Sequence, residues 1–188
     1  MKALLLIVML TVSFASFSQG KFLPEIKTGT KMQYSATVNG EQIPVGFSID
    51  SMQTDYLKIG WSVEGYGEGA WIMNKKSLQS ATGSIAENPE PGVQMVLPDD
   101  KVQLIFSKDQ WAALAKDKKT KHNNVEFNVA TAAAGDEFKL DDKIVDVVYI
   151  ESADKTSKIW LLNNPAIPVI LKITGNTAGV DLVAMSIK

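Results

Sequence analysis

Apolar and polar residues alternate one by one along much of this chain. The alternation is clearest in two runs, residues 32–38 and 43–49, which flank the dipeptide Asn39-Gly40. Alternation puts the apolar side chains of a strand on one face, and Asn-Gly favours a type I′ turn because both central residues need a positive φ. The sequence therefore predicts a β-hairpin here. Pro44 has no N–H to donate, so we expect it at a sheet edge or a bulge.

Similar runs predict strands along the rest of the chain, at residues 57–63, 102–106, 125–130, 144–151, 158–162, 169–174 and 180–187. Gly65, Gly67 and Gly69 interrupt the pattern. Glycine at every second position predicts a bent strand or a close backbone approach. The alternative is the mouth of a binding cleft.

One helix is predicted among these strands. Ser107 is its N-cap, Gln110 completes a capping box, and the helix should end near Lys116. The predicted fold class is therefore all-β, β-rich with one short helix. We expect a single antiparallel sheet that is strongly curled or forms a partly open β-barrel.

Residues 1–18 have the composition of a cleavable secretory signal peptide. Lys2 supplies the positive charge, residues 3–12 are an apolar run, and Ser16 and Ser18 occupy the −3 and −1 positions of a cut before Gln19. The apolar run is about half of the roughly 20 residues that span a bilayer, which favours cleavage over a retained membrane anchor. We therefore expect a signal peptide at 1–18, a single β-rich domain at 19–188, and no stable membrane span after cleavage.

The composition excludes several kinds of chemistry. The chain has no cysteine, so disulfides, thiolate catalysis, cysteine metal sites and lipid attachment through a lipobox cysteine are all ruled out. All nineteen basic residues are lysines, and the formal net charge of −2 becomes −3 when Lys2 is removed with the signal peptide. Arginine is the preferred residue for bidentate recognition of phosphates and base edges. Nucleic acid is therefore not an expected partner.

The residues that most often carry catalysis or bind metals have simpler interpretations here. The lone His122 lies in a lysine-rich segment and is expected to be a solvated loop residue. The acidic pairs Asp99-Asp100 and Asp141-Asp142 each adjoin a lysine, as solvated turns commonly do. The lysine-rich run 116–121 follows the predicted helix and is expected to increase solubility. We predict no catalytic residue, no metal ligand and no cofactor.

Two segments resemble a group of bacterial envelope proteins. The stretch from Leu23 to Tyr34 contains a G-x-x-x-x-Y first strand, Gly29 to Tyr34, and the ending has Ile159-Trp160-Leu161 followed by Pro165, Pro168 and a last apolar strand. These features are similar to LolA-type and TapB-type secreted domains of Gram-negative bacteria. The resemblance implies an unclosed β-barrel around a helix, with an apolar concavity that holds lipid acyl chains in the LolA-type carriers. It also implies a periplasmic or secreted location.

The first functional hypothesis is a non-enzymatic exported binding module that holds an apolar or lipid-like ligand inside a curved sheet. The ligand-binding residues would be inward-facing aromatics: Phe47, Trp61, Trp71 and Phe106. The alternative is a structural or protein-interaction domain of the cell envelope, with its core filled by its own side chains. A carboxylate-based enzyme is the third hypothesis. The sequence gives no prediction of the oligomeric state.

The signal-peptide interpretation predicts the mass of the exported product. Expression of the full chain in a Gram-negative host should yield a periplasmic or secreted protein that begins at Gln19, because Ser16 and Ser18 satisfy the small-x-small rule. Intact-mass spectrometry and N-terminal sequencing measure this directly. A product that retains residues 1–18 in the membrane fraction would contradict it.

Overall fold

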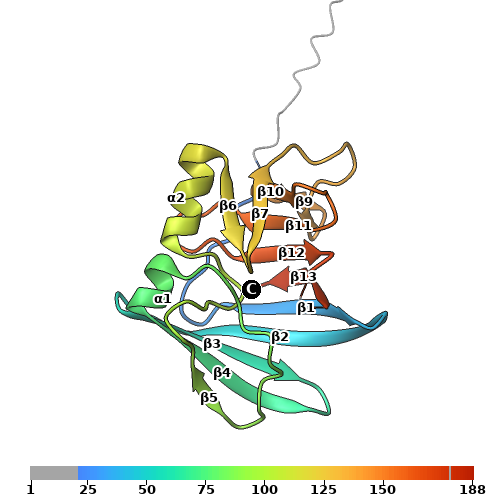
Figure 1. Ribbon diagram of the computed structural model, residues 1–188. Helices are drawn as coiled ribbons and strands as arrows, with labels where there is room; N and C mark the ends of the chain where they lie inside the picture. Colours follow the sequence, from blue (N-terminus) through green and yellow to red (C-terminus); the bar gives the residue numbers. More distant parts are fainter. Residues whose placement is uncertain (1–20, 178) are drawn as a thin grey trace, which may run out of the picture.

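The computed structural model describes residues 21–177 and 179–188, and the predicted signal peptide lies outside these ranges. The described residues form thirteen strands and two helices (Figure 1). In chain order these are β1 (Lys31–Val38), β2 (Glu41–Met52), β3 (Tyr56–Val63), β4 (Gly67–Asn74), α1 (Lys75–Ser80), β5 (Gln94–Val96), α2 (Lys108–Asp117), β6 (Lys119–His122), β7 (Val125–Val129), β8 (Lys139–Leu140), β9 (Lys143–Ile144), β10 (Val147–Ser152), β11 (Lys158–Leu162), β12 (Ile170–Thr174) and β13 (Val180–Ile187).

Eleven of these strands form one sheet in the order β5-β4-β3-β2-β1-β13-β12-β11-β10-β7-β6, and β8 and β9 form a separate pair. Neighbouring strands of the large sheet are antiparallel, except that β4 and β5 are parallel. The predicted all-β class is confirmed. The sheet does not close into a barrel, because β5 and β6 end the strand order, so the barrel part of the prediction is not supported. The described residues also contain two helices where one was expected.

The predicted first hairpin is confirmed in detail. Asn39 and Gly40 have φ angles of 52° and 84°, as a type I′ turn requires, and they connect β1 to β2. Pro44 pairs with Ser35 of β1, whereas the ladder between β2 and β3 begins only at Val45. Pro44 therefore stands where β2 has no partner on its other side, which is the edge position expected for a residue without an N–H.

The glycine-rich stretch makes the close backbone approach that was predicted. Trp61 of β3 pairs with Gly69 of β4, and a Cβ on Gly69 would lie 2.8 Å from the indole ring of Trp61 and 2.6 Å from the carbonyl oxygen of Val93. Only glycine leaves room for the large indole beside the β4 backbone.

Both helices begin at a capping side chain. Ser107 and Gln110 form the expected capping box at the start of α2, which ends at Asp117. The short helix α1 was not predicted from the sequence. Its N-cap is Asn74, whose side-chain oxygen accepts hydrogen bonds from the backbone N–H groups of Lys76 and Ser77. With only six residues, α1 has too few turns to give a helical hydrophobic pattern.

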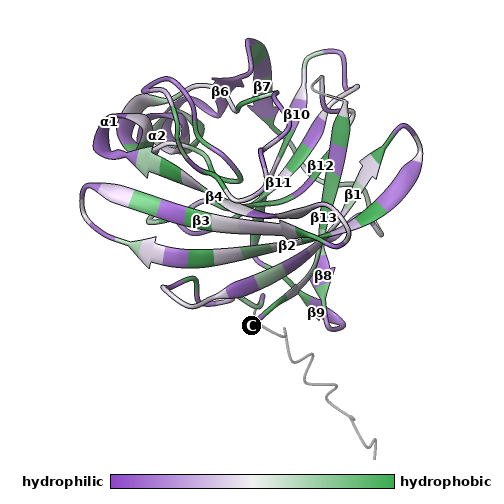
Figure 2. Cartoon of the chain, turned by 90° about the horizontal axis from the view of Figure 1, so that it is seen from below, coloured by the Kyte–Doolittle hydropathy of each residue, from purple (hydrophilic) through white to green (hydrophobic). Residues whose placement is uncertain are grey.

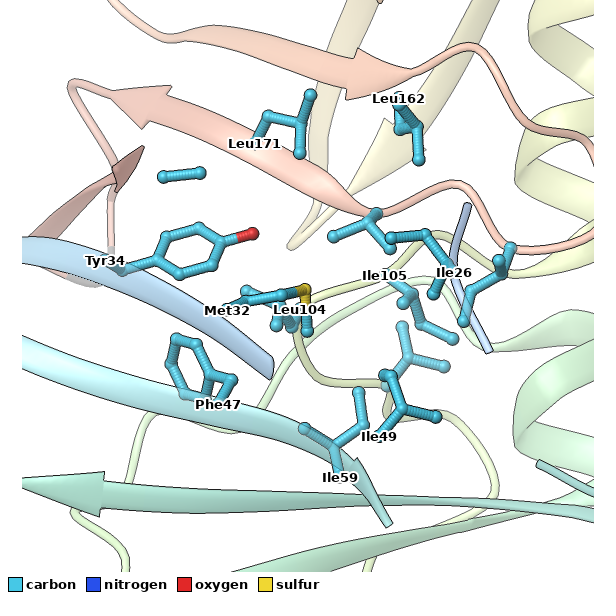
Figure 3. Packing of buried hydrophobic residues seen from close by; sticks show 14 of the residues in the cluster. Ile26, Met32, Tyr34, Phe47, Ile49, Ile59, Leu104, Ile105, Leu162 and Leu171 are labelled. Carbon is cyan, nitrogen blue, oxygen red and sulfur yellow. The ribbon is translucent and has the colours of Figure 1, made fainter. Parts of the chain in front are cut away.

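Two apolar clusters lie on opposite faces of the sheet. The larger is enclosed by β1–β4 on one side and by β10–β12 on the other, so the sheet curls around it (Figure 3). The smaller lies on the other face of β10–β12, where Phe106 and Leu114 cover Ile159 and Leu161. Strands β10–β12 are therefore apolar on both faces, whereas β1–β4 show apolar and polar residues in alternation (Figure 2).

The inside of the curled sheet is filled by the chain itself. Within residues 97–106, Leu97, Val102, Leu104 and Ile105 are buried in the larger cluster, whereas Asp99 and Asp100 form an exposed turn and Phe106 belongs to the smaller cluster. Leu104 has a φ of 64°, a conformation that costs a bulky L-residue roughly 1–2 kcal/mol. Its carbonyl oxygen accepts a hydrogen bond from the Ile170 N–H at 2.8 Å. Burial of its side chain and this bond to β12 offset the backbone strain.

The hydroxyl of Tyr34 connects the two halves of the sheet. Tyr34 is 1% exposed, and its hydroxyl donates a 2.9 Å hydrogen bond to the carbonyl oxygen of Ile170. Complete burial of the ring raises the pKa of this phenol far above its usual value. The hydroxyl therefore stays protonated and remains a donor at all pH values at which the fold is stable.

Removal of this hydroxyl should destabilise the protein. In Tyr34→Phe we expect the free energy of unfolding to fall by about 1–2 kcal/mol, because a buried carbonyl loses its donor. Urea denaturation gives the value. The matched control is Tyr56→Phe, whose exposed hydroxyl accepts a bond from Ser51 and should change stability by less than about 0.5 kcal/mol. Equal effects of the two variants would contradict the role assigned to Tyr34.

Candidate functional site

The structure brings together three of the four aromatic residues predicted to bind a ligand. Phe47, Trp61 and Trp71 belong to the larger core cluster and are 7%, 3% and 5% exposed. The ring centroids of Phe47 and Trp71 are 6.0 Å apart, and those of Trp61 and Trp71 are 6.1 Å apart. Phe106 is separate from them. It is 1% exposed, lies in the smaller cluster and stacks on His122 with a centroid distance of 4.7 Å.

Two polar atoms in this interior have no hydrogen-bond partner among the described residues. They are the indole N–H of Trp71 and the side-chain oxygen of Gln103. An unpaired buried polar group typically costs about 1–3 kcal/mol. Gln103 belongs to the segment that crosses the interior, next to the strained Leu104. The segment is otherwise bonded through its backbone, for example from the Val102 N–H to the Gly83 carbonyl, so the Gln103 oxygen is an isolated exception within it.

The other candidate site is a cavity on the outer face of β1–β5, which is the face turned away from the apolar interior. We call it the outer-face groove. Its volume is about 440 Å³, and its lining is Lys31, Gln33, Gly46, Phe47, Ser48, Asp50, Lys58, Gly60, Trp61, Ser62, Glu68, Gly69, Ala70, Gly92 and Gln94. Typical small-molecule sites have volumes of about 300–1,000 Å³. Most of the lining side chains are polar, in contrast to the packed apolar interior behind the same strands.

Strand register explains why a groove forms at this place. One row across the strands runs Lys31–Ser48–Gly60–Ala70–Gln94, and the adjacent row runs Gln33–Gly46–Ser62–Glu68. Small residues occupy the middle of both rows, so the backbone of β2–β4 forms the floor. Longer side chains stand at both ends of each row. The groove therefore crosses the strands.

Neighbouring side chains lie close over the two central glycines. A Cβ on Gly60 would lie 2.5 Å from the hydroxyl oxygen of Ser48 and 2.9 Å from a carboxylate oxygen of Asp50. A Cβ on Gly46 would lie 2.6 Å from the hydroxyl oxygen of Ser62. Any larger residue at these positions would displace the polar side chains of the groove.

The centre of the groove is held by a small polar network. The Ser48 hydroxyl donates a 2.6 Å hydrogen bond to Asp50, and the Lys58 ammonium lies 3.8 Å from the same carboxylate. These contacts keep Asp50 in place over Gly60. Because Lys58 and Asp50 carry opposite charges, the centre of the groove has no net charge.

The lone histidine is buried, which corrects the prediction of a solvated loop residue. His122 is 3% exposed and lies in strand β6. Its Nδ1 atom lies 3.1 Å from the side-chain nitrogen of Gln110. The same nitrogen donates to the Lys121 carbonyl, and the side-chain oxygen of Gln110 accepts from the Ser107 N–H. Nδ1 must therefore accept, and the imidazole proton is on Nε2. Burial, followed by the charge of Lys101, lowers the pKa of His122 to about 4.

A signal in the sequence was available for this burial. Lys119 and Lys121 are exposed, whereas Thr120 and His122, which alternate with them, are buried. The lysine-rich run therefore continues as an alternating strand. The two outward lysines also discourage β6, which ends the sheet, from pairing with another chain.

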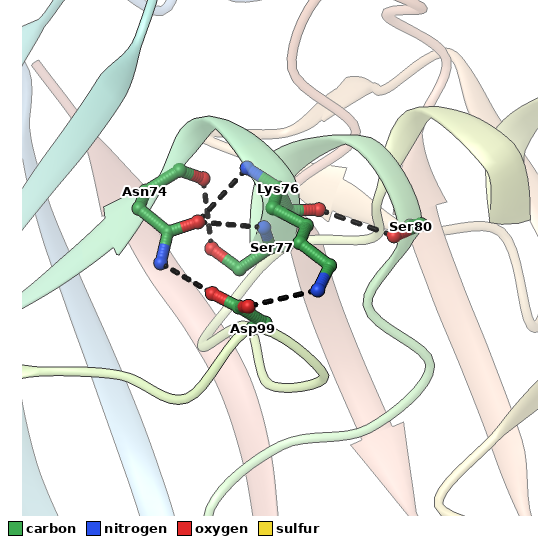
Figure 4. A network of polar contacts seen from close by, with 5 residues as sticks. All are labelled: Asn74, Lys76, Ser77, Ser80 and Asp99. Carbon is green, nitrogen blue, oxygen red and sulfur yellow. Dashed lines mark hydrogen bonds and ion pairs between the residues drawn. The ribbon is translucent and has the colours of Figure 1, made fainter.

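The acidic pairs lie in exposed turns, as predicted. Asp99 accepts a hydrogen bond from the side chain of Asn74 at 2.9 Å and pairs with the Lys76 ammonium at 3.0 Å (Figure 4). These two interactions lower the pKa of Asp99 and connect the turn to the start of α1. Asp141 and Asp142 form the turn between β8 and β9. Within residues 21–177 and 179–188, no three or more acidic or histidine side chains gather as metal ligands would.

Comparisons with known proteins give no relative for this chain. No protein-family model, no curated protein and no solved structure matches it. The resemblance to LolA-type and TapB-type domains stays a prediction. In the part of the chain that the structure describes, neither helix has the length and apolar character of a membrane span.

Burial of His122 predicts a stability that depends on pH. The unfolded chain protonates its imidazole near pH 6.5, whereas the folded protein does so only near pH 4. Between these values the unfolded state binds more protons, so the free energy of unfolding falls as the pH falls. The loss should be about 2 kcal/mol between pH 7 and pH 5.

Urea denaturation at both pH values measures this loss. His122→Phe keeps an aromatic ring against Phe106 and has no imidazole to titrate. Between pH 7 and pH 5, the free energy of unfolding of the variant should therefore fall by about 2 kcal/mol less than that of the wild type. Equal pH dependence in the wild type and the variant would show that another group is responsible.

Proposed function

We propose that this chain is a non-enzymatic exported binding module that holds a small polar ligand in the outer-face groove. Its place of action would be the periplasm or the cell exterior, as the predicted signal peptide implies. The observation that carries the proposal is the groove itself: a cavity of about 440 Å³ lined mainly by polar side chains from five neighbouring strands.

The lining has the properties of a site for reversible polar contacts. Serine hydroxyls and glutamine amides both donate and accept hydrogen bonds, and Ser48, Ser62, Gln33 and Gln94 supply them at both ends and in the centre. The hydroxyls of Ser48 and Ser62 lie over the glycines of the floor, so they are the groups that a ligand would contact there. These groups are fixed by strand pairing rather than by flexible loops, which reduces the entropy lost on binding.

A binding role suits the groove better than catalysis does. Asp50 is held by Lys58 and Ser48, and Glu68 is exposed to solvent. The buried imidazole of His122 is engaged by Gln110 and does not line the groove.

An apolar or lipid-like ligand in the sheet interior is the second candidate. Phe47, Trp61 and Trp71 would form part of that site, and the unpartnered atoms of Trp71 and Gln103 favour it. A ligand there must displace residues 97–106, whose apolar side chains occupy the interior. That displacement exposes several buried leucine and isoleucine side chains at about 1.5–3 kcal/mol each. The open groove has no such cost.

The alternative of a structural or protein-interaction domain has one supporting feature. Strand β5 ends the sheet; Val96 within it is 63% exposed, and Val93 just before it is 38% exposed. An exposed edge with apolar side chains is a place where another chain can add a strand. β5 has only three residues, so this edge offers few hydrogen bonds.

Blocking the groove tests the proposal. Amide chemical shifts of the isotope-labelled protein are followed during titration with a tetrapeptide, a neutral tetrasaccharide and a soluble fatty acid. We expect one of the two polar probes to shift the amides of Gly46, Gly60 and Gly69, and Ser62→Trp to abolish the change by filling the groove.

The matched control is Gln42→Trp, which places a tryptophan on the outer face of the neighbouring strand β2, outside the groove lining. Its titration should equal that of the wild type. A polar probe that binds the wild type and Ser62→Trp equally, or no response to either polar probe, would contradict the groove as the site.

Native mass spectrometry separates the two candidate sites. Purified from cells, the protein should carry no acyl-chain ligand, because residues 97–106 fill the interior. Lipid extraction of the same sample provides the check. Co-purified fatty acid or phospholipid would support the interior site instead, together with amide chemical-shift changes at Trp71 and Leu104 when fatty acid is added.

A further inference from the structure

We infer that the ligand of the outer-face groove is a zwitterionic peptide of three or four residues, with its carboxylate at Lys31 and its ammonium group at Glu68. This inference rests on the proposed function, since it names the ligand of the same groove. It follows from the two charged lining residues that lie outside the central Asp50–Lys58 pair.

Lys31 and Glu68 have opposite charges at opposite corners of the groove. Lys31 is the β1 end of one row, and Glu68 is the β4 end of the adjacent row. Both residues are exposed. Within the described residues, neither side chain makes an ion pair or a hydrogen bond. A ligand can therefore pair with each charge without breaking an existing interaction.

The separation of these corners sets the length of the ligand. Three strand spacings and an offset of two residues along a strand put their Cα atoms roughly 16 Å apart. An extended peptide covers about 3.3–3.6 Å per residue, so four residues cover about 14 Å. The Lys31 and Glu68 side chains cover the remaining distance, and their reach also admits a tripeptide. Longer peptides cannot place both ends at their partners while lying flat on the floor.

The groove between the corners matches a peptide backbone. Peptide groups need alternating donors and acceptors, and the hydroxyls of Ser48 and Ser62 and the amide of Gln33 provide both. The Ser62 hydroxyl lies over Gly46, and the Ser48 hydroxyl and the Asp50 carboxylate lie over Gly60, so a peptide in the groove would meet hydrogen-bonding side chains along its length. The four charges of the lining sum to zero, which suits a zwitterion better than an anion or a cation.

Free and end-blocked peptides test this inference on the wild-type protein. The probes are tetraalanine with free termini and the same peptide acetylated and amidated, titrated into the full mature chain by calorimetry and amide shifts. We expect the free peptide to bind at least tenfold more tightly, because blocking removes both end charges. Trialanine should bind comparably to tetraalanine, and hexaalanine at least tenfold more weakly.

Charge reversal tests the two corners separately. Lys31→Glu and Glu68→Lys should each weaken binding of free tetraalanine at least tenfold. The double variant Lys31→Glu/Glu68→Lys should restore it, because the peptide can bind in the reverse direction. The controls Lys27→Glu and Glu64→Lys change exposed residues outside the lining and should leave binding unchanged. Thermal denaturation checks that all variants are folded.

The outcomes separate this inference from the proposed function. Equal binding of free and blocked peptide, or no restoration in the double variant, overturns the zwitterionic peptide. Binding of maltotetraose in the groove, abolished by Ser62→Trp, with no binding of free tetraalanine at millimolar concentration, overturns the inference and leaves the groove as a binding site. The absence of any groove-dependent binding overturns both.

Discussion

The fold depends on one curled sheet, whose two halves must pack their apolar inner faces against each other. The chain has no cysteine, so no disulfide restrains it, and packing of the two halves of the sheet must supply the stability. β1–β4 and β10–β12 meet across one cluster, and residues 97–106 fill the space between them. The requirement to fill this space explains the left-handed Leu104, the unpaired Gln103 oxygen and the buried hydroxyl of Tyr34. The first two are local costs that the surrounding packing offsets, whereas the Tyr34 hydroxyl is satisfied by the Ile170 carbonyl and stabilises the contact between the two halves.

The same requirement separates the two faces of β1–β4. Large aromatic side chains gather on the inner face, where Phe47, Trp61 and Trp71 contact one another. Small and polar residues remain for the outer face, and Phe106 and the α2 residue Leu114 cover the outer face only at β10–β12. The uncovered part is the outer-face groove. The aromatic residues expected to bind a ligand thus lie in the core, although Phe47 and Trp61 also border the groove, whose lining side chains are mostly polar.

Local patterns predicted most of the local structure, but the strand expected at residues 102–106 is wrong, because Leu104 has a φ of 64° and the segment forms no strand. The Asn39-Gly40 hairpin, the edge position of Pro44 and the Ser107 capping box follow from the backbone geometry of a few adjacent residues. The glycine-rich stretch 65–69 predicted a close approach, which Gly69 makes; Gly69 and Glu68 also line the groove. His122 was misread because its neighbours in sequence are lysines, whereas its neighbours in space are Phe106 and Gln110. Burial at such a position is decided by residues distant in the chain.

The sequence by itself determined the β-rich class, the first hairpin and the main helix, and it excluded thiol chemistry. These properties depend on periodicity, turn preferences and composition, which act over a few residues or are simple counts. Only the tertiary structure decided that the sheet stays open, that residues 97–106 occupy its interior, and that Lys31 and Glu68 stand at opposite corners of one groove. Strand order, register and curvature arise from pairing and packing between distant segments. Alternation predicts which side chains of a strand share a face, but it does not predict which strands lie next to each other.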